Sequence, residues 1–155
     1  MRYSVLFFTF YCARIIRTAK YFRSMKKDIP NLKVEDLAIA VVPRNGEELW
    51  DTYILNLRDD RISDVLINSH GYGKINGSDY KTTTLRHFFE EIGPLQIKQI
   101  EPIQTKLFQL TNEYWVSFRY DGYMYDKKYV LVKGSIDQIH FTPIPFLDRR
   151  GVMIR

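Results

Sequence analysis

Three histidines are the residues of this chain best suited to bind a metal or to transfer protons: His70, His87 and His140. The only cysteine, Cys12, lies far upstream of them, so a thiolate metal site is not expected. Neither an HxH nor an HExxH spacing is present, and these are the spacings that bring two imidazoles onto one metal. The sequence therefore predicts no metal site and no cofactor.

The dipeptide Asn76-Gly77 predicts a two-residue hairpin turn, because both central residues of such a turn need positive φ. In the simplest register, Leu66 then lies opposite His87. His70 and His87 would share one face of the hairpin but stand four positions apart, about 13 Å at 3.3 Å per residue. That separation is too large for shared ligation.

Ser69 is followed by His70 and Gly71, which suggests a serine nucleophile with an adjacent base. Neighbouring residues of a strand point to opposite faces, however, and the chain has no G-x-S-x-G motif. The sequence Gly71-Tyr72-Gly73 also lacks the Lys-Ser/Thr pair of a phosphate-binding loop. We expect a protein that is not an enzyme, and a small enzyme with a site on the His70/His87 face is the least favoured of three functions.

Aromatic residues give a stronger indication of binding. Asp121-Gly122 predicts a second tight hairpin, and in its register one face of residues 113–132 carries six aromatic side chains and Lys127, which we expect to form a core. The other face places Trp115 over Lys128, where a cation–π contact could hold the ring at the surface. The alternative, a tryptophan buried in the core, stays open. The candidate binding surface is Trp115, Lys128, Tyr72 and Tyr80.

The elements that carry these residues are short apolar or alternating runs separated by turn residues. Strands are expected at residues 38–42, 50–57, 62–69, 81–86, 97–103 and on both sides of Asp121-Gly122. Residues 84–92 fit either a strand or a helix, and the hairpin favours the strand. Pro143 and Pro145 predict an edge strand or a loop in the tail. We therefore predict an all-β fold: a single antiparallel β-sandwich, Ig-like, of about seven strands.

The net charge of +5 equals the five basic residues that residues 1–24 carry without any acid, so the remainder has no net charge. We divide the chain into an N-terminal extension at 1–24, poorly ordered or not native, and a sandwich domain at 25–155. A targeting signal and a genuine structural element are the alternatives for residues 1–24. A neutral domain disfavours nucleic acid as a partner. The apolar run at residues 3–13 is too short to cross a membrane.

Residues 25–155 resemble a small bacterial family of uncharacterised proteins, about 130 residues long, whose members start MKKDI. The resemblance rests on MKKDI at 25–29, VLI at 65–67, GY at 71–72, IE at 100–101, DKK at 126–128, GSI at 134–136 and GVM at 151–153. Some members are labelled phenylalanyl-tRNA synthetase subunits, but the chain has no adenylate-forming motif. The resemblance implies a start at Met25 and brings no known activity.

We therefore expect a non-catalytic protein-interaction or assembly module, located in the cytoplasm, with an unidentified protein partner. An RNA- or tRNA-associated accessory protein is the alternative. The sequence indicates no membrane partner and leaves the oligomeric state open.

Overall fold

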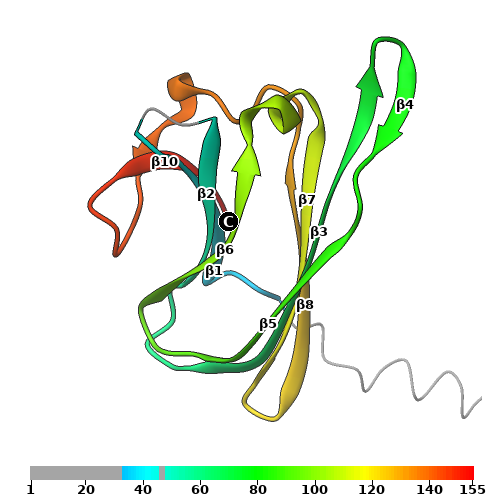
Figure 1. Cartoon of the computed structure of the whole chain (residues 1–155). Coiled ribbons are helices and arrows are strands. Elements are labelled where there is room, and N and C mark those ends of the chain that lie inside the picture. Colours follow the sequence, from blue (N-terminus) through cyan, green and yellow to red (C-terminus); the bar gives the residue numbers. More distant parts are fainter. Residues whose placement is uncertain (1–32, 46–47) are drawn as a thin grey trace, which may run out of the picture. The chain divides into compact units, whose positions relative to one another are not determined.

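The structure, a computed structural model, describes residues 33–45 and 48–155. These residues form ten strands and two short 3₁₀ helices (Figure 1). The strands are β1 (Leu37–Pro43), β2 (Leu49–Asn56), β3 (Ile62–Ile75), β4 (Ser78–Lys81), β5 (Leu85–Ile92), β6 (Gln96–Gln104), β7 (Thr111–Tyr120), β8 (Tyr123–Leu131), β9 (Thr142–Pro143) and β10 (Arg150–Ile154). The 3₁₀ helices are η1 (Thr105–Gln109) and η2 (Gln138–His140).

The strands form two antiparallel sheets that pack against each other, so the predicted all-β sandwich is confirmed (Figure 1). The first sheet has the order β6-β2-β1-β10-β9. The second has the order β4-β3-β7-β8, and β5 pairs with the same edge of β3 as β4 does, farther along this long strand. Six of the seven expected strands are present, and β9 and β10 add to them. The strand expected at residues 81–86 is interrupted, because Lys81 ends β4, residues 82–84 lie in no strand and Leu85 begins β5. Pro143 lies in β9 at the edge of its sheet, where a missing N–H costs no ladder bond.

The core lies between the sheets and is built from alternate residues of each strand. Ile39 and Val41 of β1 face Ile67 of β3 and Phe118 of β7, all fully or almost fully buried. The alternate residues of β1, such as Ala38 and Ala40, are also buried, because Ile144 and Leu147 pack on the outer side of the first sheet. Burial on both faces explains why β1 is a continuous apolar run rather than an alternating one.

Both predicted tight turns are present. Asp121 and Gly122 have φ of 48° and 76°, and Asn76 and Gly77 have φ of 51° and 81°. The β7–β8 pairing follows the expected register over its whole length, with Trp115 opposite Lys128. The aromatic face of this hairpin is core for most of its length: Tyr114, Phe118 and Tyr129 are buried, and Tyr120 and Tyr125 are partly buried against them. Tyr123, beside the turn, is exposed, so the prediction of a core fails there.

The register predicted for the other hairpin is wrong beyond its first four pairs. Tyr72 pairs with Lys81 as expected, but Ser69 pairs with Leu85, so the strand gains one residue between β4 and β5. Thr82 holds this irregularity in place: its N–H donates to the Gly71 carbonyl at 2.9 Å, and its Oγ1 accepts from the Gly71 N–H at 2.8 Å. A slip of one residue turns every later side chain to the other face.

His87 is therefore opposite Ile67, on the inner face, and not opposite Leu66 on the outer one. His70 stays on the outer face, beside the Tyr72 ring at 5.7 Å between centroids. The two histidines do not share a face, and that expectation is corrected. Residues 84–92 form the strand β5 and not a helix.

A second irregularity lies in β6. Thr52 pairs with Glu101 and Tyr53 pairs with Gln99, so Ile100 is an extra residue in the ladder. The simple alternation expected for residues 97–103 therefore fails. Ile97 packs on the outer side of the first sheet, whereas Ile103 is in the core between the sheets.

The predicted N-terminal extension at 1–24 and the predicted start at Met25 lie outside the described residues. Among the described residues, no helix is long and apolar enough to cross a membrane.

Candidate functional site

The second sheet presents its outer face to solvent, and Trp115 lies near the middle of that face. Its side chain is 46% exposed, so the tryptophan is at the surface and not in the core. The Lys128 ammonium lies 4.9 Å from the ring centroid, the cation–π contact that the register predicts. Glu113 holds Lys128 from the other side, with 3.2 Å between the Glu113 carboxylate and Nζ. The tryptophan that packs against the core is Trp50, and its ring centroid lies 4.9 Å from that of Phe108.

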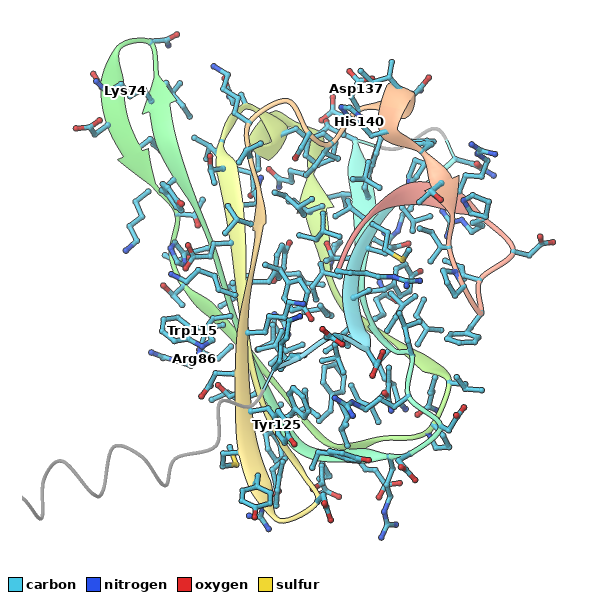
Figure 2. The ribbon with its side chains drawn as sticks, turned by 180° about the vertical axis from the view of Figure 1, so that it is seen from behind. Lys74, Arg86, Trp115, Tyr125, Asp137 and His140 are labelled. Carbon is cyan, nitrogen blue, oxygen red and sulfur yellow. The ribbon has the colours of Figure 1, made fainter. Side chains whose placement is uncertain are left out.

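The strand pairings place further side chains around Trp115. Asn68 of β3 is opposite Trp115 on one side and Arg86 of β5 on the other, so the three form one row across the sheet. Arg86 and Trp115 lie on the same side of the sheet in Figure 2. In the next row Leu66 is opposite Phe88, and both are exposed. We call the set Leu66, Arg86, Phe88, Trp115 and Lys128 the Trp115 face.

The two tyrosines of the candidate surface do not join this face as one patch. Tyr72 is on the same side of β3 as Asn68, but four residues farther along the strand, about 13 Å away. Tyr80 pairs with Gly73, the residue after Tyr72, and therefore points to the opposite side of the β3–β4 ribbon. Both tyrosines are exposed on the arm that extends beyond the sandwich in Figure 1.

A cavity of about 160 Å³ opens between the two sheets, on the inner side of β3. Its lining residues come from β3, the β4–β5 connection, β5, β6, η1 and β7: Ser69, His70, Gly71, Thr82, Thr83, Leu85, Glu101, Pro102, Ile103, Leu107, Asn112 and Tyr114. Thr83, Leu85 and Pro102 are exposed, so the cavity reaches the surface. We call it the inter-sheet cavity.

Glu101 is the central charged group of the inter-sheet cavity. Its Oε1 accepts a hydrogen bond from Ser69 Oγ at 2.6 Å, and its Oε2 lies 3.0 Å from His87 Nε2. The Glu101 side chain is only 11% exposed, and Ser69 is buried. Glu101 belongs to the first sheet and both partners belong to the second, so these bonds also join the sheets.

Tyr114 is a buried residue that lines the same cavity as Ser69 and Glu101. Its hydroxyl lies 3.5 Å from Thr52 Oγ1, and burial raises the pKa of Tyr114 well above its ordinary value, with the nearby Glu101 charge acting in the same direction. Tyr114 therefore stays protonated at neutral pH and can act only as a neutral hydrogen-bonding group.

The chemistry of this group differs from that of a serine hydrolase. In a catalytic triad the imidazole contacts the serine hydroxyl and the carboxylate orients the imidazole. Here the carboxylate of Glu101 lies between Ser69 and His87 and accepts from the serine, so the imidazole does not contact the hydroxyl. The described residues also contain no group of three His, Cys, Asp or Glu side chains that could hold a metal. The arrangement suits binding of a ligand to a fixed carboxylate.

Sequence reasoning missed Glu101 and the role of His87. Both errors have one physical cause, because each residue follows an extra residue in its ladder, at Ile100 and at residues 82–84. The run Thr82-Thr83-Thr84 next to a glycine-containing strand was the available signal of irregular pairing. No family model matches the chain, and no curated protein is similar to it.

Proposed function

We propose that this protein is a non-catalytic protein-interaction module and that its partner docks on the Trp115 face. The observation that carries the proposal is the exposed Trp115 ring held beside Lys128, in the middle of a sheet face that no part of residues 33–45 and 48–155 covers. A tryptophan fixed in this way gives a large contact area and loses little side-chain entropy on binding. Leu66 and Phe88 extend the apolar surface next to it.

Charge on the face defines the partner's chemistry. Lys128 is paired with Glu113, and Arg119 at the same side of β7 is paired with Asp64 at 3.2 Å. Arg86 makes no ion pair with any described residue, although it lies in the same row as Trp115. A protein surface that presents an apolar side chain next to a carboxylate would fill the tryptophan contact and neutralise Arg86. We therefore propose such an acidic–apolar protein surface as the partner.

The connectivity supports an Ig-like version of the sandwich as part of this proposal. Strands β1-β2-β6 are neighbours in one sheet, and β3-β7-β8 are neighbours in the other. This is the order of strands A-B-E and C-F-G in immunoglobulin domains, with β5 beside β3 in the place of C′. We also propose a cytoplasmic location, which fractionation of cells that produce a tagged chain would test.

The first prediction is that Trp115→Ala removes the partner without unfolding the protein. Because the side chain is 46% exposed, its loss leaves no closed cavity, and the melting midpoint should fall by no more than a few °C. The test is affinity purification from native lysate, with co-purified proteins identified by mass spectrometry. Tyr123→Ala is the matched control, because Tyr123 is 51% exposed at the tip of the same hairpin but outside the Trp115 face.

The expected result is one set of proteins that wild-type and Tyr123→Ala retain and Trp115→Ala loses. Equal recovery by all three would contradict the proposal. Loss of salt-sensitive RNA, rather than protein, in Trp115→Ala would instead favour the RNA-associated alternative, since Arg86, Trp115 and Lys128 also suit a stacked base and a phosphate.

A further inference from the structure

The inter-sheet cavity is large enough for a small organic molecule. Its volume is about 160 Å³, and an apolar protein cavity of about 150 Å³ is known to hold benzene. It opens between the exposed residues Thr83, Leu85 and Pro102, so a ligand can enter from solvent. It lies on the inner side of the second sheet, and the Trp115 face is on the outer side. A ligand there is independent of the proposed partner.

Three of the lining side chains that can donate hydrogen bonds, Ser69, Thr82 and Asn112, already donate within the protein. The Ser69 hydroxyl donates to Glu101. The Thr82 hydroxyl donates to the Thr83 carbonyl at 2.9 Å. The Asn112 amide nitrogen donates to the carbonyls of Leu107 and Leu110, at 3.0 and 3.2 Å. A ligand that needs donors, such as a carboxylate or a phosphate, would find few of them here.

Hydrogen-bond acceptors, by contrast, remain available to a ligand in the cavity. The two Glu101 oxygens accept one hydrogen bond each, from Ser69 and His87, and a carboxylate has about four acceptor positions. Because the Asn112 nitrogen is bound to backbone carbonyls, its oxygen points toward Gly71 on the cavity wall: a Cβ added at Gly71 would lie 3.1 Å from it. The cavity thus offers a charged acceptor and a neutral one.

The Glu101 charge has little compensation in its surroundings. Neither lysine nor arginine lines the cavity, and the basic group in contact with Glu101 is the His87 imidazole. A carboxylate that is 11% exposed has lost most of its hydration, so an incoming cation gains more from it than from an exposed acid. Leu85, Pro102, Ile103 and Leu107 supply an apolar wall for the rest of the ligand.

We infer that the inter-sheet cavity binds a small organic amine, with the ammonium group on Glu101 and a hydrocarbon body of benzene size against the apolar wall. A matched set of three probes tests the charge requirement: benzylamine, benzyl alcohol and benzoate share one ring and differ in the head group. Each is titrated into the ¹⁵N-labelled full chain at pH 7, and backbone amide shifts are followed.

Benzylamine should give saturable shifts at cavity residues such as Ser69, Gly71 and Asn112, with a Kd on the order of 1 mM. Benzyl alcohol should bind at least about tenfold more weakly, and benzoate should give no saturable shift, because a carboxylate is repelled by Glu101. Equal binding of amine and alcohol, shifts confined to other parts of the chain, or no saturation by benzylamine at about 50 mM would each overturn the inference.

Glu101→Gln keeps the shape of the side chain and removes its charge, so it should weaken benzylamine at least about tenfold and abolish the preference over the alcohol. Glu91→Gln is the control, since it removes an exposed carboxylate of β5 that pairs with Arg61 at 3.3 Å and does not line the cavity. Unchanged benzylamine affinity in Glu101→Gln would overturn the inference.

Should Glu101→Gln fail to fold, Leu85→Trp provides a second variant. Leu85 is 49% exposed at the cavity mouth, so the larger ring is tolerated by the fold and narrows the entrance. It should abolish the benzylamine shifts at Ser69 and Asn112. Retention of those shifts with wild-type affinity would overturn the inference.

Discussion

At the scale of single residues, Asn56 shows how one side chain replaces several backbone bonds. It is fully buried at the end of β2. Its Nδ2 donates to the carbonyls of Asp60 and Gly93, both at 2.8 Å, and its Oδ1 accepts from the Arg58 N–H at 3.1 Å. The loop after β2 and the end of β5 are thus joined through one amide.

Asn56→Ala should destabilise the protein by about 2–4 kcal/mol, because it removes three hydrogen bonds that a fully buried side chain makes. The measurement is the free energy of unfolding from urea titration. Asn68→Ala is the control: Asn68 lies on the outer face of β3, makes no such set of bonds, and should cost less than about 1 kcal/mol. Equal losses of unfolding free energy in the two variants would mean that the Asn56 hydrogen bonds stabilise the protein no more than the half-buried Asn68 side chain does.

Glu101 and Trp115 mark the limits of what can be predicted at this scale. Trp115 could be placed opposite Lys128 from the sequence, because the Asp121-Gly122 turn fixes that register. Its exposure could not, since a large aromatic ring on a mostly polar strand face is buried whenever another part of the chain packs over it. Glu101 could not be placed at all, because its direction depends on the extra residue at Ile100.

At the scale of elements, hairpin turns were predictable and ladder irregularities were not. Both two-residue turns contain a residue type that tolerates positive φ followed by glycine, which is a local signal. The extra residue between β4 and β5 is held by a bond from Gly71 to Thr82, eleven positions away in the chain. The threonine run at 82–84 signals irregular pairing but does not say where the extra residue falls, so the predicted register holds only up to Lys81.

The β7–β8 turn gives the clearest test of an element. Gly122 has φ of 76°, and a Cβ placed there would meet no atom within 4 Å, so only backbone strain opposes a larger residue. Gly122→Val should therefore cost on the order of 1–3 kcal/mol of unfolding free energy. Gly122→Asn should lower the free energy of unfolding clearly less than Gly122→Val does, because asparagine tolerates positive φ. Thermal or urea unfolding compares the two, and equal costs would contradict a strained turn.

At the scale of the whole molecule, the second sheet separates two surfaces. Its inner side packs against the first sheet and contributes Ser69 to the inter-sheet cavity and His87 as a partner of Glu101, and its outer side carries the Trp115 face. Because successive residues of a strand alternate in direction, neighbouring positions of β3 serve different sites. Substitutions at even-numbered positions such as Leu66 or Asn68 should therefore affect the partner, and those at Ser69 should affect the cavity.

The stability of the whole molecule should fall steeply in alkaline solution. Tyr114 and Tyr129 are buried, and burial raises the pKa of each hydroxyl well above the ordinary tyrosine value of 10.0. Above pH 10 the unfolded chain releases these protons while the folded protein keeps them, so the free energy of unfolding decreases with pH. Each tyrosine contributes up to about 1.4 kcal/mol per pH unit, and the effect is absent below about pH 9.

Urea unfolding at pH 8, 10 and 11 measures this slope. The double variant Tyr114→Phe/Tyr129→Phe should be less stable than wild type at pH 8, because the Tyr129 hydroxyl bonds the Leu37 carbonyl at 3.0 Å, yet it should lose less stability between pH 10 and pH 11. Tyr123→Phe changes an exposed hydroxyl and should follow the wild-type curve. Parallel curves for the double variant and wild type would show that groups other than these two tyrosines cause the alkaline loss.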